Sequence, residues 1–246
     1  MLGLNGRDVV LKSLVGSHNY NLANEESDRD FKVFVTPTFD ELYLGQRYAK
    51  EIITPTEDND IHDVRKLTDL LFKANINYLE VLASNDLYIP TGNTEMHSIV
   101  KLKKDIFRMN LPHLFNACKG MYLDKMKNLS RGTEGTKHLV DRYGYDTKQA
   151  THAMRVLRTA VNFESTNFED FDSSIRYYDN ELKLMLDIRH GEYSKEEFEK
   201  IAHTYFYLVF TPLAKKYGSY KPNLELKDEL ESIVMKLIKR KLLTKA

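Results

Sequence analysis

The stretch Gly16-Ser-His-Asn-Tyr-Asn-Leu-Ala-Asn-Glu-Glu-Ser-Asp-Arg-Asp-Phe-Lys-Val-Phe-Val35 decides the fold. The apolar residues before it predict a short strand that runs into a Gly-Ser turn: Val9, Val10, Leu11, Leu14 and Val15. A polar loop follows, and from Asp28 the residues alternate with a period of two, which predicts a second strand ending near Pro37. One face of this strand would carry Phe31, Val33 and Val35, and the other face Asp28, Asp30, Lys32 and Phe34.

The pattern changes along the chain from strands to helices. Residues 38–50 fit a short helix and loop, and Ile52–Ile53 and Asp58–Val64 fit further strands. From Arg65 apolar residues recur every three or four positions, which indicates helices, and Ser194-Lys-Glu-Glu resembles a helix cap. The later expected helices are Leu114–Leu129, Thr147–Val161, Ser173–Arg189, Ser194–Lys216 and Leu226–Leu243. We therefore expect an α+β protein: a small mixed β-sheet core with flanking helices in residues 1–105, then a mostly helical region in residues 106–246.

The composition is that of an ordinary soluble globular protein, with 42% hydrophobic and 29% charged residues. No apolar run approaches the length of a membrane span, and the first residues lack a secretion signal. Cys118 is the only cysteine, which excludes an intrachain disulfide and argues against a cysteine-based zinc site. These features predict a cytoplasmic protein with no membrane partner.

The charge is unevenly distributed, although the net charge is zero. Residues 1–63 contain 6 basic and 12 acidic residues, whereas residues 101–158 contain 13 basic and 5 acidic residues. An acidic zone and a basic zone suit metal ions and phosphates respectively. Two solvated surfaces with a chance imbalance explain the same counts, and charge alone favours that interpretation.

The spacing of Gly16-Ser17 and Asp28-x-Asp30 carries the chemistry. Nucleotidyl transfer needs attack on the α-phosphate of a nucleoside triphosphate, and two divalent ions about 4 Å apart stabilise the attacking and leaving oxygens. Two aspartates at i and i+2 of a strand point to the same side, and Mg²⁺ prefers carboxylate oxygens. The Gly-Ser turn allows the backbone to approach the triphosphate, and the Ser17 hydroxyl can donate to it. The alternative is a turn followed by two exposed strand acids.

The pattern resembles the signature of the DNA polymerase beta superfamily, and in particular its RlaP-type, RNA-repair-associated nucleotidyltransferases. Gly16-Ser-His-Asn-Tyr-Asn-Leu…Glu26-Ser-Asp-Arg-Asp is similar to that family's Gly-Ser-His-x-Tyr-Gly-Leu…Glu-Ser-Asp-x-Asp. Leu71-Phe-Lys-Ala-Asn-Ile-Asn-Tyr-Leu-Glu-Val-Leu82 is similar to its Lys-Gly-Asn-Pro-Asn-x-Leu-Glu-x-Leu, and Gly144–Arg155 and Ile188–Glu192 are similar to its later helical region. The match spans roughly residues 8–200. Asn21 stands where the family usually has Gly, and Ile76 where it has Pro.

The resemblance implies a third carboxylate from a neighbouring strand. Asp58 and Asp60 are both candidates, because they fall on one face of the expected strand and Asp63 does not. With Asp28 and Asp30 they would hold two Mg²⁺ or Mn²⁺ ions, and the third acid would assist deprotonation of the acceptor hydroxyl. A solvated acidic loop remains the alternative for this stretch.

A second set of candidates would contact the nucleotide. His18 follows the Gly-Ser turn and would contact the triphosphate or the acceptor, so it joins Gly16 and Ser17 as a binding residue. Lys148, His152 and Arg155 share one helix face, which would hold phosphates or a polynucleotide backbone as the helical domain completes the cleft. An exposed basic helix face is the alternative.

Other charged residues fit structural roles. Glu80 lies in an apolar helical stretch and needs a buried partner, and Arg65 and Lys66 are either phosphate contacts or surface charges at a helix start. The basic, amphipathic C-terminal segment from Lys236 indicates a packing helix rather than a nucleic-acid contact.

The expected function is transfer of a nucleoside monophosphate from a nucleoside triphosphate such as ATP to an acceptor hydroxyl, with release of pyrophosphate. The acceptor is an RNA end, a protein side chain or a small molecule, and overall neutrality argues against a strong nonspecific nucleic-acid binder. Two alternatives stay open: a non-catalytic nucleotide-binding regulatory module, and a toxin-like enzyme that modifies protein or tRNA.

Overall fold

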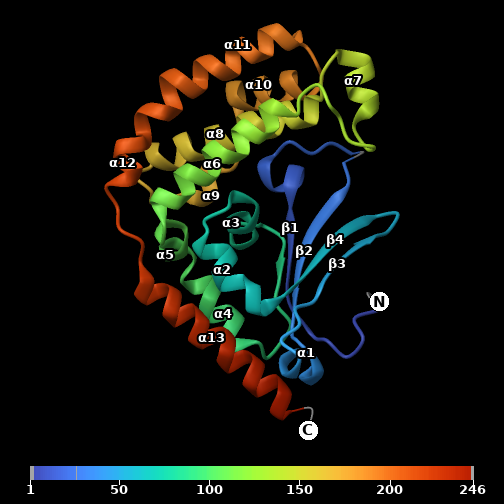
Figure 1. The fold of residues 1–246 in the computed structure, drawn as a ribbon, viewed down its shortest axis with the longest axis vertical. Helices are drawn as coiled ribbons and strands as arrows, with labels where there is room; N and C mark the ends of the chain where they lie inside the picture. Colours follow the sequence, from blue (N-terminus) through green and yellow to red (C-terminus); the bar gives the residue numbers. More distant parts are fainter. Residues whose placement is uncertain (1–2, 26, 245–246) are drawn as a thin grey trace. The chain divides into compact units, whose positions relative to one another are not determined.

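The computed structural model describes residues 3–25 and 27–244 and has the expected α+β fold (Figure 1). Its five-stranded sheet has the order β3-β4-β2-β1-β5. The β2–β4 pair is parallel and the other pairs are antiparallel, so the sheet is mixed, as predicted. The strands are β1 (Val9–Val15), β2 (Arg29–Val35), β3 (Ala49–Ile53), β4 (Glu57–Asp63) and β5 (Leu87–Tyr88).

The alternation of β2 sorts its side chains onto two faces, as the sequence predicts. Phe31, Val33 and Val35 pack with Ile61 of β4 in one apolar cluster. The register pairs Asp30 with Asp58 and Lys32 with Asp60, so these charged residues share the opposite face. One strand therefore contributes both to the core and to a polar face.

Within the described ranges, six α-helices belong to the same compact unit as the sheet: α1 (Phe39–Tyr43), α2 (Leu67–Phe72), α3 (Ile76–Leu82), α4 (Thr94–Lys101), α5 (Lys103–Arg108) and α13 (Leu224–Leu243). The helical pattern after Arg65 is interrupted between α2 and α3, because Ala74 has a φ of 47°. The side chain of Asn75 then caps α3 by accepting a hydrogen bond from the Asn77 amide. The chain thus turns sharply before it reaches Glu80.

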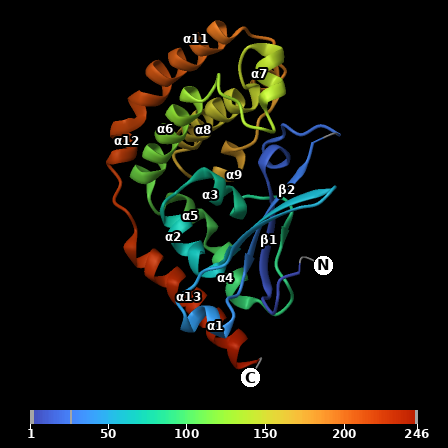
Figure 2. The ribbon, with the colours of Figure 1, turned by 45° about the vertical axis from the view of Figure 1, so that its right-hand side comes forward.

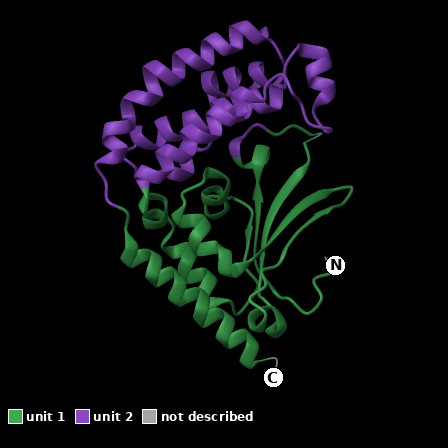
Figure 3. Ribbon diagram, in the orientation of Figure 1, with its two compact units in different colours: residues 1–19, 23–110, 222–246 green, residues 20–22, 111–221 purple. Residues whose placement is uncertain are grey.

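The C-terminal helix α13 belongs to the same compact unit as the sheet. Its buried stripe consists of Leu226, Leu230, Val234 and Leu237, and it packs against α2 and α4. Arg240 adds an ion pair of 2.8 Å with Glu95 of α4. Unit 1 therefore contains residues 1–19, 23–110 and 222–246 (Figure 3).

Unit 2 contains residues 20–22 and 111–221 and is helical. Its central helix α8 packs against α6 and α10. The predicted helix over 173–189 is divided, because Asp179 has a φ of 47° at the start of α10. The helices are α6 (Leu111–Lys127), α7 (Lys137–Tyr143), α8 (Thr147–Ser165), α9 (Phe171–Ser174), α10 (Asp179–Arg189), α11 (Lys195–Tyr205), a π-helix (Phe206–Phe210), a 3-10 turn (Thr211–Leu213) and α12 (Ala214–Gly218).

A short segment of the N-terminal motif, Tyr20–Leu22, packs within unit 2. The Tyr20 ring is fully buried, and the Arg155 guanidinium lies 4.1 Å from its centroid. The Arg189 side chain donates to the Leu22 carbonyl at 3.0 Å.

Across residues 3–25 and 27–244, no helix combines the length and the apolar character that crossing a membrane requires.

Candidate active site

The end of β1 and the beginnings of β2 and β4 meet at one rung of the sheet. Val15 of β1 lies opposite Asp30 of β2, and Asp30 lies opposite Asp58 of β4. Residues directly opposite one another in a sheet point to the same face, with Cβ atoms about 5 Å apart. The rung therefore places two carboxylates side by side, next to the turn that begins at Gly16.

Gly16 is needed at this place for two reasons. Its φ of 69° lies in the left-handed region, which glycine adopts without strain. A Cβ at position 16 would also lie only 2.6 Å from Oδ2 of Asp30. The absent side chain therefore leaves room for the carboxylate beside the turn.

The Gly16 turn is held in place by Glu80 of α3, which is only 2% exposed. The Gly16 amide donates to Oε2 of Glu80 at 3.1 Å, and the buried Asn19 side chain donates to the Glu80 carbonyl at 3.0 Å. The sequence indicated a structural role for Glu80 but not its partner. The signal was a carboxylate in an apolar helical stretch, which requires a hydrogen-bond donor.

Asp58 and Asp60 share a face but differ in their contacts. Oδ2 of Asp60 lies 2.8 Å from Nζ of Lys32 and 2.9 Å from Nε2 of His62. These contacts, with His62 first, hold the pKa of Asp60 well below its usual range. Asp58 is partly buried and makes no ion pair or side-chain hydrogen bond within the described ranges. Its carboxylate is thus the one not already neutralised by neighbouring groups.

The loop that carries Asp28 is tied to the Gly-Ser turn. His18 lies in the 3-10 helix Gly16–Tyr20, together with Ser17, and its Nε2 donates to the Ser27 carbonyl at 3.3 Å. Asp28 itself is exposed, one residue before β2 begins. Glu26 of the same motif lies outside the described residues.

A family model matches residues 4–204 of the chain, and its description is RNA repair pathway DNA polymerase beta family. The chain belongs to that family. Membership indicates a DNA polymerase beta-like nucleotidyltransferase, and the resemblance seen in the Gly-Ser and Asp-x-Asp motifs is confirmed. None of the curated proteins matches the chain in sequence.

At the positions where the chain departs from the RlaP family's motifs, its backbone has a conformation that the family's residues also favour. Asn21 has a φ of 62°, in the region that glycine favours and asparagine tolerates. Ile76 occupies the first position of α3, where proline is favoured because that amide needs no helical partner. In the same loop Ala74 stands where the family segment has Gly and adopts a φ of 47°. Neither the turn nor the helix start is lost.

The three basic candidates of this RlaP-family chain lie on α8 in unit 2. Lys148 is exposed in the first turn, and Nη2 of Arg155 donates to Nε2 of His152 at 3.0 Å. Burial, together with the charges of Arg155 and Lys125, lowers the pKa of His152 well below its ordinary value. His152 is therefore neutral near pH 7 and accepts from Arg155, so the positive charges of this face are Lys148 and Arg155.

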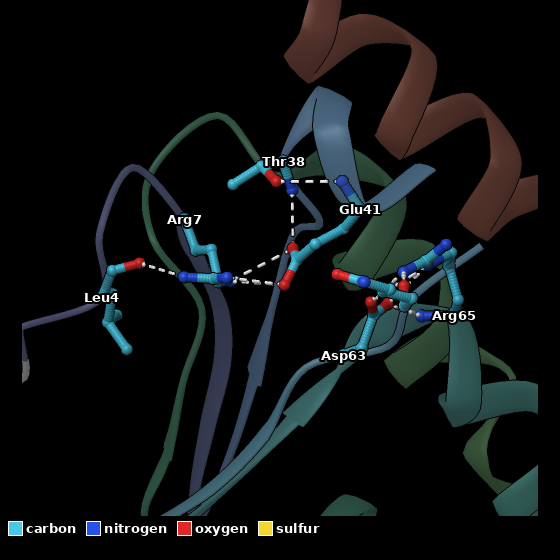
Figure 4. A network of polar contacts seen from close by, with 7 residues as sticks. Leu4, Arg7, Thr38, Glu41, Asp63 and Arg65 are labelled. Carbon is cyan, nitrogen blue, oxygen red and sulfur yellow. Dashed lines mark hydrogen bonds and ion pairs between the residues drawn. The ribbon is translucent and has the colours of Figure 1, made fainter. Parts of the chain in front are cut away.

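Arg65 is held at the opposite end of the strands, as Figure 4 shows. Its guanidinium pairs with the fully buried carboxylate of Asp63 at 2.5 Å and also donates to the Gln46 carbonyl. A second pair, Arg7 with Glu41 at 2.6 Å, lies close by. These contacts favour a structural role for Arg65 over contact with a phosphate.

The donor set at the rung is chemically suited to a hard divalent cation. Asp28, Asp30 and Asp58 offer only carboxylate oxygens, the ligands that Mg²⁺ and Mn²⁺ prefer. No group of three or more His, Cys, Asp or Glu side chains is gathered closely enough to hold a metal among the residues that the structure describes. Asp30 and Asp58 form the adjacent pair, and Asp28 lies on the loop beside them.

Proposed function

We propose that the protein transfers a nucleoside monophosphate from a nucleoside triphosphate to an acceptor hydroxyl and releases pyrophosphate. The observation that carries this proposal is the rung on which Asp30 and Asp58 stand side by side next to the Gly16 turn. Asp28, Asp30 and Asp58 would hold two Mg²⁺ or Mn²⁺ ions. Such ions, when bound, stabilise charge on the attacking and leaving oxygens.

The residues of the chain have separate roles in this proposal. Asp58 is the base that accepts the proton of the acceptor hydroxyl, because its carboxylate is not engaged by another side chain. The acceptor oxygen then bonds to the α-phosphorus while the bond to the bridging oxygen breaks, and pyrophosphate leaves. Gly16 allows the triphosphate to approach the backbone, the Ser17 hydroxyl donates to it, and His18 orders the loop before Asp28.

The acceptor favoured by the family description is an RNA end. Lys148 and Arg155 of α8 would contact phosphates of the nucleotide or of a polynucleotide, and neutral His152 would orient Arg155 by accepting its hydrogen bond. The excess of basic residues over 101–158 supports a phosphate ligand for this part of the chain. Protein side chains and small molecules are the other acceptor classes.

The test is incorporation of α-labelled nucleotide from each of the four triphosphates, with Mg²⁺ or Mn²⁺ and with total RNA or cell extract as acceptor. Asp30→Ala and Asp58→Ala should each lose about 100-fold or more of the transfer, equivalent to roughly 3 kcal/mol of transition-state stabilisation. Asp40→Ala, which removes an exposed aspartate of α1, is the matched control and should retain activity. Nucleotide binding by folded wild type without any transfer would favour the regulatory binding module instead.

A further inference from the structure

A groove in unit 1 lies between α13, α1 and the turn Val64–Lys66. It has a volume of about 430 Å³. Most of its wall is apolar, and three charged side chains also line it. The lining residues are Leu42, Arg65, Glu231, Val234, Met235, Ile238, Lys239 and Leu242.

Large apolar side chains lie exposed on the two elements that form the groove. On α13, Met235 is 67% exposed and Leu243 is 69% exposed. On and next to α1, Phe39, Tyr43 and Leu44 are 69%, 82% and 61% exposed. In both views of the ribbon, α1 lies beside the C-terminal half of α13 (Figures 1 and 2). Exposed apolar side chains beside an apolar groove are typical of an interaction site.

The charges along α13 change sign at its middle. Residues 224–233 carry the acids Glu225, Asp228, Glu229 and Glu231, with Lys227 the one base, whereas residues 234–243 carry only bases, namely Lys236, Lys239, Arg240 and Lys241. The helix is therefore complementary to a second copy of itself that runs in the opposite direction. A wholly acidic or wholly basic partner would match only one half.

The two charged residues of α13 at the groove have no ion-pair partner within their own chain. Lys227, Arg240 and Lys241 are paired with Asp69, Glu95 and Asp8. Glu231 and Lys239, in contrast, form no ion pair in the portion of the chain that the structure describes. Burial and the nearby carboxylate of Asp69 raise the pKa of Glu231, and the more distant charges of Lys227 and Arg47 offset this only in part.

We propose that a second copy of this chain docks on the groove, with the two α13 helices antiparallel and the two-fold axis at Met235. Glu231 and Lys239 lie four residues on either side of Met235. The axis therefore brings Glu231 against Lys239 of the partner subunit, and the same contact forms a second time by symmetry. Met235 would meet its counterpart at the axis and Ile238 would pack beside it, and the exposed residues of α1 would flank this apolar contact.

The occupant is a copy of the chain rather than a membrane, because an anionic lipid surface would attract Lys239 but repel Glu231 and the acidic half of α13. An isologous helix pair satisfies both charges. This inference does not depend on the nucleotidyl-transfer proposal, and its test measures mass rather than activity.

The test is the molar mass of the full chain, measured by sedimentation or by light scattering after gel filtration, over a range of concentrations. Wild type should form dimers. Glu231→Lys and Lys239→Glu should each weaken dimerisation about 10-fold or more, since each places like charges together at two symmetric contacts. The double variant E231K/K239E should restore the dimer, because it exchanges the charges without changing their complementarity.

Glu229→Lys is the matched control, since it makes the same change on the same helix at an exposed residue outside the groove, and it should leave the dimer unchanged. Met235→Cys should form a disulfide-linked dimer under mild oxidation, because the residue meets itself at the axis. Leu208→Cys, equally exposed at 72%, should not, and the native Cys118 is buried. A monomeric wild type at high concentration, or a double variant that stays dissociated, would overturn the proposal.

Discussion

At the residue scale, Asp58 and Asp60 should separate into a functional and a structural acid. Asp58→Asn should lower transfer about 100-fold and leave the melting temperature unchanged or raised, because it removes a carboxylate directly opposite Asp30. Asp60→Asn should lower transfer less than about tenfold. It should cost about 1 kcal/mol of stability, because the largely buried Lys32 ammonium loses its partner.

Incorporation assays and thermal unfolding of the two variants, measured side by side, check this prediction. A loss of transfer in Asp60→Asn with full transfer in Asp58→Asn would reverse the assignment. The sequence could not distinguish the two acids, since both fall on one strand face. The distinction comes from two contacts of Asp60. Lys32 reaches it through the register between β2 and β4, and His62 lies two residues further along β4 on the same face.

A second residue-scale prediction concerns Gly16. Gly16→Ala should destabilise the protein by about 1–3 kcal/mol and reduce transfer, because the alanine meets both an unfavourable φ and the Asp30 carboxylate. Gly144→Ala is the matched control: its φ is 79°, but no atom lies within 4 Å of the added Cβ. It should cost about 1 kcal/mol and leave transfer unchanged. Equal losses of transfer in both variants would show that backbone strain alone, and not the Asp30 contact, matters.

At the element scale, the ion pair between α13 and α4 should make stability depend on pH. The hydrogen bond from Arg240 lowers the pKa of the buried Glu95 carboxyl to about 2, from an ordinary 4.5. A carboxyl with a depressed folded-state pKa stabilises the fold above its unfolded pKa, and the contribution is lost as pH falls from about 4.5 towards 2. Glu95→Gln should therefore cost on the order of 2 kcal/mol at pH 7, and progressively less below pH 4.5.

Urea unfolding of wild type and Glu95→Gln at pH 7, 4 and 3 measures this difference. Asp86→Asn is the control, since its pair with Arg29 is about half exposed and should contribute little at any pH. A constant difference between wild type and Glu95→Gln at all three pH values would contradict the argument.

Local periodicity predicted the elements well where it was strong. The alternation of β2 and the helices α6, α8 and α13 follow directly from the spacing of apolar residues. The breaks at Ala74 and Asp179 were not predictable, because each depends on a non-glycine residue held at positive φ by its surroundings. The helix α7 was also not predicted. None of its residues is buried, so its sequence has no apolar periodicity that would indicate a helix.

At the scale of the whole molecule, the two compact units are interleaved along the chain. Residues 222–246 pack with the sheet although they follow the helical unit, and residues 20–22 pack with the helical unit although they lie in the N-terminal motif. Neither assignment is encoded in a local pattern, since an amphipathic helix does not indicate which surface its apolar stripe covers. In the sequence the three-residue segment is visible only as part of the Gly-Ser motif.

This interleaving predicts that residues 1–110 will not fold alone. The fragment lacks α13, whose buried residues are Leu226, Leu230, Val234 and Leu237. The surface of the fragment that normally packs against these residues would therefore be exposed to water. Burial of each such side chain is worth about 1.5–3 kcal/mol, so the loss approaches the whole stability of a typical domain. A synthetic peptide of residues 222–246, added in trans, should restore a cooperative thermal transition, whereas a peptide with Leu230→Asp and Leu237→Asp should not. Cooperative melting of the fragment without any peptide would show that α13 is peripheral to the core, and the ion pair of Arg240 with Glu95 would then be its main anchor.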